Sequence, residues 1–295
     1  MSDRCNSNGK KTIVFGDPPR RGKFKKIFLP CGQCIGCRLA RSRDWALRCV
    51  HESKLHYQNC YLTLTYDDEH VPWSTVTGEQ TLKKKDLQDF MKRLRFHLHP
   101  LKVRFFACGE YGEETHRPHY HVILFGYDFP DKTLFSISKD GFPYYVSPFL
   151  QKIWQNGQCL VADVTFETCA YVARYVTKKL TGEAGKEAYE GIQPEFVNMS
   201  RRPGIGKDWY DEYKADLYPY DEAILQGNNG TRVMRIPRYY DKLLEQEDPL
   251  LLESIKEKRI ERGERKAWEI IQKGRLEDKE KYQLNKTKDF KRSAY

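Results

Sequence analysis

The sequence predicts an α+β fold built around an antiparallel sheet. Short runs of apolar or alternating residues, bounded by turn residues, predict strands. Longer segments with apolar residues at helical spacing separate them and predict helices. These elements follow one another in the order strand, helix, strand, strand, helix, strand, helix. Strands with short connections pair antiparallel, and the helices between them pack on the sheet.

A helix, a strand and a second helix open this series. Residues 38–56 place apolar side chains on one side and arginines on the other, which predicts an amphipathic helix. Residues 59–66 are rich in threonine and apolar side chains and end at a turn-prone pair of aspartates, so they predict a strand. In residues 83–99 the apolar positions recur at helical spacing, and Pro100 ends the helix.

A hairpin and a third helix follow. Residues 103–110 and 119–126 predict two strands joined by a charged turn. Ser147 and Pro148 are a favourable N-cap and first-turn pair for the next helix, and Gly157 is expected to end it.

A last strand, residues 159–165, leads directly into a further helix. The first six elements of the series match the split βαβ order of ferredoxin-like folds. In that arrangement helices cover one face of an antiparallel sheet and leave the other face open. We therefore expect the functional residues on the open face.

The strand at 119–126 begins with two histidines. His119 and His121 point to the same face because side chains alternate along a strand, while Val122 and Leu124 remain available for packing. Two imidazoles on a rigid strand can bind a divalent metal ion. A pair of surface histidines on an ordinary sheet is the alternative reading of this short motif.

The helix after the last strand carries a second group of reactive side chains. Tyr171, Tyr175 and Lys179 lie four residues apart and share a helix face, with Arg174 and Lys178 beside them. Tyrosine can act as a covalent nucleophile, and a nearby cation stabilises a phenolate or a developing phosphate charge. The alternative is an amphipathic helix that uses its tyrosines as core and its lysines as a solvated last turn.

Together these motifs resemble the HUH endonucleases that initiate rolling-circle replication, in particular the replication initiators of microviruses, including the gokushovirus-like phages. The histidine, bulky residue, histidine motif is matched by His119, Tyr120 and His121. The paired tyrosines are matched by Tyr171 and Tyr175, and the threonine-rich first motif by residues 61–66. The motifs stand in the family order over residues 59–180. A looser similarity extends to the cysteine-rich start and to residues 200–206, for which the sequence indicates no mechanism.

The resemblance implies an RRM-like HUH fold with the histidine strand central and the tyrosine helix against it. It also implies metal-assisted transesterification, in which tyrosine attack on single-stranded DNA leaves a 5′-phosphotyrosine link and a free 3′-hydroxyl. His119 and His121 would hold Mg²⁺ or Mn²⁺, with Glu110 as the third ligand, although Glu113 and Glu114 also stand close by.

A second tyrosine would let the cycle repeat while the first still holds the old 5′ end. The family pattern of a tyrosine followed three positions later by a lysine fits Tyr175 with Lys178. It also fits Tyr171 with Arg174, apart from the change in residue type. The order in which the tyrosines act stays open.

The charge distribution agrees with a DNA-binding enzyme. The net charge is +10, and residues 1–60 hold 13 basic and 4 acidic side chains, against 38 and 37 in the remaining 235. Attraction to phosphate is therefore concentrated at the N-terminus, unless this is only a solvated basic arm. No apolar run reaches the length of a membrane span and the start lacks a signal-peptide core, so we expect a soluble protein in the host bacterial cytoplasm. The expected partners are single-stranded or supercoiled viral origin DNA and the host DNA polymerase and helicase.

Three of the nine cysteines have the spacing of a metal knuckle. Cys31, Cys34 and Cys37 are separated by two-residue gaps that contain glycine, which permits tight turns. Cys5 is the first candidate for the fourth ligand of a structural Zn²⁺, with the cysteines at 49 and 60 behind it. The bacterial ferredoxin pattern would require a cysteine where Arg41 stands, which disfavours an iron-sulfur cluster. Free buried thiols are the alternative.

These signals divide the chain into three expected parts. They are a basic cysteine-rich segment with a helix at 1–57, the endonuclease core at 58–182 and a charged, partly helical extension at 183–295. Within the extension we expect loops and short helices to residue 246, then helical segments broken at Gly263 and Gly274. The sequence shows no phosphate-cradling GxxxxGK loop, so no helicase is attached.

Two other functions compete with the nicking enzyme. A non-catalytic zinc-containing protein for DNA binding or packaging would explain the charge and the cysteines, but not the histidine, glutamate and tyrosine sets. A hydrolase that activates water at the same metal would use the histidines without the tyrosines. A covalent link between protein and DNA separates these three functions.

Overall fold

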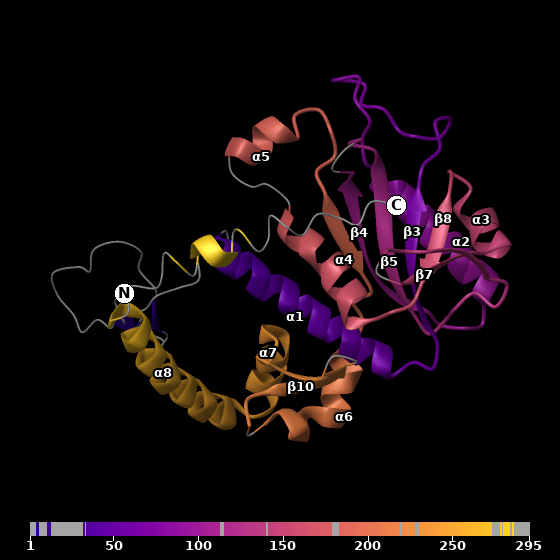
Figure 1. Cartoon of the computed structure of the whole chain (residues 1–295). Helices are drawn as coiled ribbons and strands as arrows, with labels where there is room; N and C mark the ends of the chain where they lie inside the picture. The colour runs from indigo at the N-terminus through magenta and orange to yellow at the C-terminus, as the bar shows by residue number, and fades with distance from the viewer. Residues whose placement is uncertain are drawn as a thin grey trace.

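Figure 1 shows the computed structural model of the chain. The structure describes residues 4–5, 11–12, 32, 34–112, 115–139, 141–178, 183–218, 220–227, 230–272, 278, 280–283 and 285.

A seven-stranded antiparallel sheet forms the centre of the fold, in the order β6-β7-β8-β3-β5-β4-β9. The α+β fold with a central antiparallel sheet is thereby confirmed. The middle strand, β3 (Asn59–Thr65), pairs with β5 (Pro118–Phe125) on one side and β8 (Cys159–Ala162) on the other. β4 (Arg104–Tyr111) pairs with β5 along its whole length.

Helices cover both faces of this sheet (Figure 1). On one face, α2 (Lys84–Leu98) and α3 (Pro148–Trp154) pack on the core that contains Leu62, Val122 and Leu124. On the other face, α1 (Ile35–Lys54) and α4 (Phe166–Lys178) pack on a second core, made by the opposite set of alternating side chains.

The expectation of an open sheet face is therefore wrong. The long helix α1 lies before the split βαβ unit in the chain and runs alongside α4, so that Ala46 and Cys49 of α1 share a buried core with Ile123 and Phe125 of β5. The histidine strand sends its functional side chains into this covered layer. The site is thus enclosed by the protein rather than displayed on a bare sheet.

The predicted elements of the central region are present with small shifts at their ends. Ser147 caps α3 as expected, because its hydroxyl oxygen accepts the Leu150 N–H at 3.0 Å and Pro148 begins the helix. The helix ends at Trp154 and not at Gly157, since Gln155 takes the left-handed conformation with φ 66°.

Gly157 has a different role from the one the sequence indicates. Its φ is 141°, and a Cβ at this position would lie 2.3 Å from the amide nitrogen of Asp67. The loop at Gly157 passes this close because the Asp67 N–H donates to the Asn156 carbonyl and the Thr65 N–H donates to the Gln158 carbonyl. Glycine is required here for close approach of two backbone segments.

Three strands extend the sheet beyond the predicted ones. β6 (Thr133–Ile137) and β7 (Pro143–Val146) form a hairpin at one edge. β9 (Phe196–Met199) pairs with β4 at the other edge. Thus β9 and α1, which both lie outside residues 58–182, belong to the same packed layer structure as the elements within that range.

The expected loops and short helices after residue 180 are accompanied by strands. The chain forms α5 (Glu183–Ala188), then β9, α6 (Lys207–Leu217), the hairpin of β10 (Ala223–Gly227) and β11 (Gly230–Met234), and α7 (Arg238–Glu247). A third core forms where α6, α7 and the β10–β11 hairpin meet α1. Near the N-terminus, β1 (Arg4–Cys5) pairs with β2 (Lys11–Thr12).

The C-terminal helix α8 (Pro249–Gln272) continues through Gly263, so the predicted break there is wrong. An isolated glycine costs a helix only about 1 kcal/mol, and no atom would meet a Cβ at Gly263. The base of α8 is fixed by Arg259, whose guanidinium pairs with Asp221 at 2.5 Å and with Asp241 at 2.6 Å. Gly274 lies outside the described residues.

The segment 200–206, for which the sequence indicates no mechanism, is a tightly held connection between β9 and α6. The buried carboxylate of Glu52 accepts the Gly206 N–H at 2.7 Å, and the Arg48 guanidinium donates to the Ile205 carbonyl at 3.0 Å. A Cβ at Gly204 would lie 2.5 Å from the Tyr239 hydroxyl. The glycines therefore allow this connection to pack on α1 and α7.

In the part of the chain that the structure describes, no helix combines the length and the apolar composition that a bilayer-spanning segment requires.

Candidate active site

The pairing of β4 with β5 places an acidic residue beside the histidines. Glu110 lies directly opposite His119, and Cys108 lies opposite His121. Residues two apart on a strand share a face, so Glu110, His119 and His121 all point into the layer under α4. The hairpin register therefore brings together the three side chains that the sequence and the resemblance predict as metal ligands.

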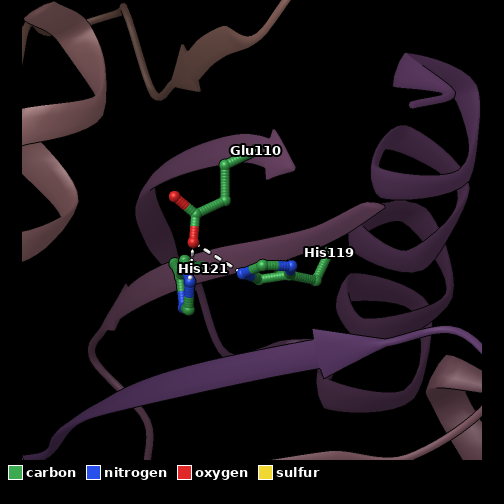
Figure 2. Close-up of side chains that lie close together, drawn as sticks. All are labelled: Glu110, His119 and His121. Carbon is green, nitrogen blue, oxygen red and sulfur yellow. Dashed lines mark hydrogen bonds and ion pairs between the residues drawn. The ribbon is translucent and has the colours of Figure 1, made fainter. Parts of the chain in front are cut away.

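The two imidazoles meet at a single carboxylate oxygen (Figure 2). The Nε2 atom of His119 lies 2.5 Å from Oε1 of Glu110, and the Nε2 atom of His121 lies 2.8 Å from the same oxygen. The side chains of Glu110 and His121 are 0% and 1% exposed, while that of His119 is 16% exposed. The cluster is thus reachable only from the His119 side.

His119 has a defined tautomer when it is neutral. Its Nδ1 lies 3.1 Å from the Arg117 backbone carbonyl, which can only accept, so Nδ1–H is the donor. The Nε2 atom then carries a lone pair and faces Glu110. A lone pair and a carboxylate oxygen at 2.5 Å require a shared proton or a metal ion between them.

Two hydroxyls of the central strand hold His121 from its other ring nitrogen. The Tyr61 hydroxyl lies 2.5 Å from Nδ1 of His121, and the Thr63 hydroxyl lies 3.3 Å from it. Thr63 stands directly opposite His121 in the β3–β5 pairing, and Tyr61 stands diagonally across. Hydroxyls can donate or accept, so both fit either tautomer of the ring.

The electrostatics of the cluster favour an ionised carboxylate. Burial by itself would raise the pKa of the Glu110 carboxyl, but the charge of His121 and the hydrogen bonds from His119 and His121 outweigh it. The net effect lowers this pKa to about 2. Glu110 is therefore negative at neutral pH and its charge is directed at the two imidazoles.

This donor set fits a divalent ion. The ligand atoms of Glu110, His119 and His121 lie within 4.8 Å of one another, and two imidazoles with one carboxylate are a common combination for first-row metals. Octahedral bonds of about 2.1 Å place neighbouring ligand atoms about 3 Å apart, a few tenths of an ångström wider than here. Small side-chain rotations would accommodate the ion. Glu113 and Glu114 lie outside the described residues.

Tyr171 is placed against the cluster by α4. Its ring meets the His121 ring edge to face, with 5.1 Å between centroids and an angle of 85° between planes. The Arg174 guanidinium lies 5.9 Å from the centre of the Tyr171 ring. The structure therefore brings together one predicted tyrosine, one predicted cation and the metal-ligand set.

The remaining predicted residues of the tyrosine helix are only partly described. α4 includes positions 175 and 178, but the side chains of Tyr175 and Lys178 lie outside the described part of the chain. Lys179 lies outside the described residues altogether. Since Tyr175 follows Tyr171 by four residues on one helix, its backbone lies one turn further along α4.

Two cysteines of the predicted zinc knuckle begin α1. Cys34 is the exposed N-cap residue, and Cys37 follows in the first turn. Cys31 lies outside the described residues, as does the side chain of Cys5. The knuckle itself is thus described only at its C-terminal half.

The cysteines at 49 and 60 cannot complete this zinc site. Cys49 lies twelve residues after Cys37 on the same helix, about 18 Å along its axis. Thiolates bound to one zinc ion lie about 4 Å apart, because each Zn–S bond is about 2.3 Å. Cys60 is buried in the core on the other side of the sheet, beyond the far end of α1.

The chain belongs to the replication-associated proteins of microviruses. The family model of the replication-associated protein ORF2 matches residues 59–180, the range that holds both the histidine strand and the tyrosine helix. The chain is 32% identical to the Replication-associated protein ORF2 of Spiroplasma virus 4 over 239 residues, which cover 78% of this chain and 72% of that protein.

Two further phage proteins are similar. The Replication-associated protein VP4 of Bdellovibrio phage phiMH2K is 32% identical over 257 residues, covering 83% of this chain and 76% of the relative. The Replication-associated protein ORF4 of Chlamydia phage 1 is 30% identical and covers 73% of this chain and 53% of the relative. No solved structure matches the chain significantly.

Proposed function

We propose that this protein is a replication initiator that nicks and rejoins single-stranded DNA at the viral origin by tyrosine transesterification. The observation that carries this proposal is the contact between Tyr171 and His121, because it places a nucleophile against the metal-ligand set. Membership of a replication-associated family supports the biological role.

Glu110, His119 and His121 would hold the divalent ion, Mg²⁺ or Mn²⁺. When bound, the ion supplies Lewis-acid activation of the scissile phosphate and orients it for in-line attack. The enclosed position of Glu110 and His121 keeps bulk water from these two ligands, which strengthens their attraction for a cation. His119, on the exposed side of the cluster, faces the direction from which a strand could approach.

Tyr171 would attack the phosphorus with its phenol oxygen. A bond forms between that oxygen and phosphorus while the bond to the 3′ oxygen breaks, and the 3′ oxygen takes up a proton to become a hydroxyl. One phosphate ester replaces another, so the energy of the cut bond is kept for rejoining. Arg174, with Lys178 and Lys179 further along, would stabilise the phenolate and the developing charge on phosphate.

Tyr175 would serve as the second nucleophile. After one round of synthesis the displaced strand must be cut again while the first tyrosine still holds the old 5′ end. Two phenols one helical turn apart could exchange these roles without hydrolysis. The free 3′-hydroxyl would prime the host DNA polymerase, with a host helicase separating the strands in the bacterial cytoplasm.

The cysteine knuckle would add a structural zinc ion. Cys31, Cys34 and Cys37, with Cys5 as the fourth ligand, would fold the basic N-terminal segment against the start of α1. This segment carries most of the net positive charge and would increase affinity for the DNA backbone.

A covalent adduct separates the proposal from its rivals. End-labelled single-stranded oligonucleotides that tile the viral genome are incubated with the protein, with Mn²⁺ or with chelator, and run on a denaturing gel. The expected result is a label-shifted protein band that requires Mn²⁺ and disappears when His119→Ala and His121→Ala are combined. Cleavage without an adduct would instead favour hydrolysis by water, and binding without cleavage would favour a DNA-binding or packaging protein.

A further inference from the structure

Tyr61 contacts both parts of the candidate site. It lies on β3 and is 6% exposed, with its hydroxyl 2.5 Å from Nδ1 of His121. The two rings are nearly parallel, with 5.6 Å between centroids and 12° between planes. The edge contact of the same Tyr61 ring with Tyr171 spans 6.4 Å between centroids, at 82°.

The sequence motif around Tyr61 does not reveal this role. In residues 61–66 tyrosine reads as an ordinary residue of a buried strand, where large aromatic side chains usually serve packing. The register of β3 against β5 decides otherwise, because it sets Tyr61 diagonally across from His121 on the same face.

We propose that Tyr61 is a positioning residue that accepts the Nδ1–H of His121 and so turns the Nε2 lone pair toward the ion site. Its ring at the same time sets the place of Tyr171 relative to His121. This inference rests on the proposed function for its meaning in catalysis, but its effect on ion binding can be measured separately.

The two histidines need comparable support to act as ligands. His119 obtains it from a backbone carbonyl, which fixes Nδ1–H as the donor. His121 has hydroxyl oxygens in the same place, at 2.5 Å from Tyr61 and 3.3 Å from Thr63. A metal-bound imidazole normally donates its other N–H to such a partner, and loss of that partner costs about 10–100-fold in metal affinity or activity.

The test compares Tyr61→Phe with wild type. This change removes the hydroxyl and keeps the ring that contacts Tyr171, so packing is largely conserved. The matched control is Tyr218→Phe, which removes another buried hydroxyl, 3.0 Å from Asp241 in the third core. Both variants lose one buried hydrogen bond, but only the first touches the site.

Two measurements are made without DNA. Titration calorimetry with Mn²⁺ is expected to give a dissociation constant about 10–100-fold higher for Tyr61→Phe and within about threefold of wild type for Tyr218→Phe. Nitrogen NMR of ¹⁵N-histidine protein is expected to show the His121 Nδ1–H form losing population in Tyr61→Phe. An unchanged dissociation constant together with an unchanged His121 tautomer would overturn the inference.

A third measurement uses the adduct reaction. Tyr61→Phe is expected to lower kcat about 10–100-fold at fixed Mn²⁺ with little change in KM for the oligonucleotide, since the residue acts through His121. Thr63→Val, which removes the longer contact, is expected to weaken Mn²⁺ less and provides a second variant should Tyr61→Phe fold poorly. If wild type binds Mn²⁺ but forms no adduct, the proposed function fails while the calorimetric result for Tyr61 still decides this inference.

Discussion

The His121 imidazole is held between two aromatic residues of different elements, and the one on α4 is Tyr171, whose ring it meets edge to face at 5.1 Å. This contact links the end of β5 to a helix that begins more than forty residues later. Because both partners are set in regular elements that share one core, their relative position is fixed by the fold. A preset distance between nucleophile and ion site reduces the entropy cost of reaching the reactive geometry.

Removing the negative charge of Glu110 is expected to abolish ion binding by the histidine pair. Glu110→Gln keeps the shape of the side chain but loses the charge directed at both imidazoles, so adduct formation should fall at least about 100-fold. The exposed Glu69→Gln is the control and should keep full activity. Calorimetry with Mn²⁺ and the adduct gel measure the two effects, and wild-type binding by Glu110→Gln would remove it from the ligand set.

The knuckle is expected to hold about one zinc ion per chain. Cys34→Ser combined with Cys37→Ser should lose this zinc, whereas Cys159→Ser should keep it because that thiol is buried beside α3. Metal analysis of purified protein gives the zinc content of each. Absence of zinc in wild type, with all nine thiols reacting in the native state, would contradict the site.

Acid is expected to destabilise the protein through His51. This side chain is buried against Trp209 and Tyr240, and burial, with a smaller effect of Lys54, lowers its pKa to about 3. Between the ordinary pKa of about 6.5 and the native value, the unfolded chain binds a proton that the native protein does not. Stability is therefore fully present above pH 6.5 and falls below it, by up to about 1.4 kcal/mol per pH unit for this group.

Urea unfolding between pH 7 and pH 5 tests this effect. His51→Gln should lower stability at pH 7 and flatten its pH dependence relative to wild type. The exposed His99→Gln removes a histidine without removing a buried one and serves as the control. An identical slope in wild type and His51→Gln would show that His51 is not the group responsible.

The close approach at Gly157 is expected to make this position intolerant of alanine. Gly157→Ala brings a Cβ to 2.3 Å from the Asp67 amide nitrogen, so backbone must move, at a cost of about 3 kcal/mol or more. Gly78→Ala is the matched control, because Gly78 also has a positive φ of 71° but no atom within 4 Å of the added carbon. It should cost about 1 kcal/mol in urea unfolding. Equal losses would contradict the close contact.

Local pattern was sufficient for the centre of the fold. The strands that became β3, β4 and β5 are buried on both sides of the sheet and their apolar runs are unmistakable in the sequence. The edge strands β6 and β9 were missed, since β6 is exposed throughout and neither carries an alternating pattern. The covered face was missed because the position of α1 depends on contacts with α4 that no local pattern encodes.

The same division applies to the site. His119 and His121 stand out because two histidines on one strand face are a local signal. The join between them and Glu110 follows from the hairpin register, and the roles of Tyr61 and Thr63 follow from the register of a strand more than fifty residues away. Hydroxyls on a threonine-rich strand were the available signal, but they indicate a partner only once the pairing is known.

The most direct test of the account identifies the residue that carries the DNA. The Mn²⁺-dependent adduct of wild-type protein is digested and the peptide with the attached nucleotide is mapped by mass spectrometry. We predict attachment at Tyr171 or Tyr175, some cleavage by Tyr171→Phe and by Tyr175→Phe alone, and none by the double variant. Attachment at a tyrosine outside α4, or full activity of the double variant, would contradict the central claim.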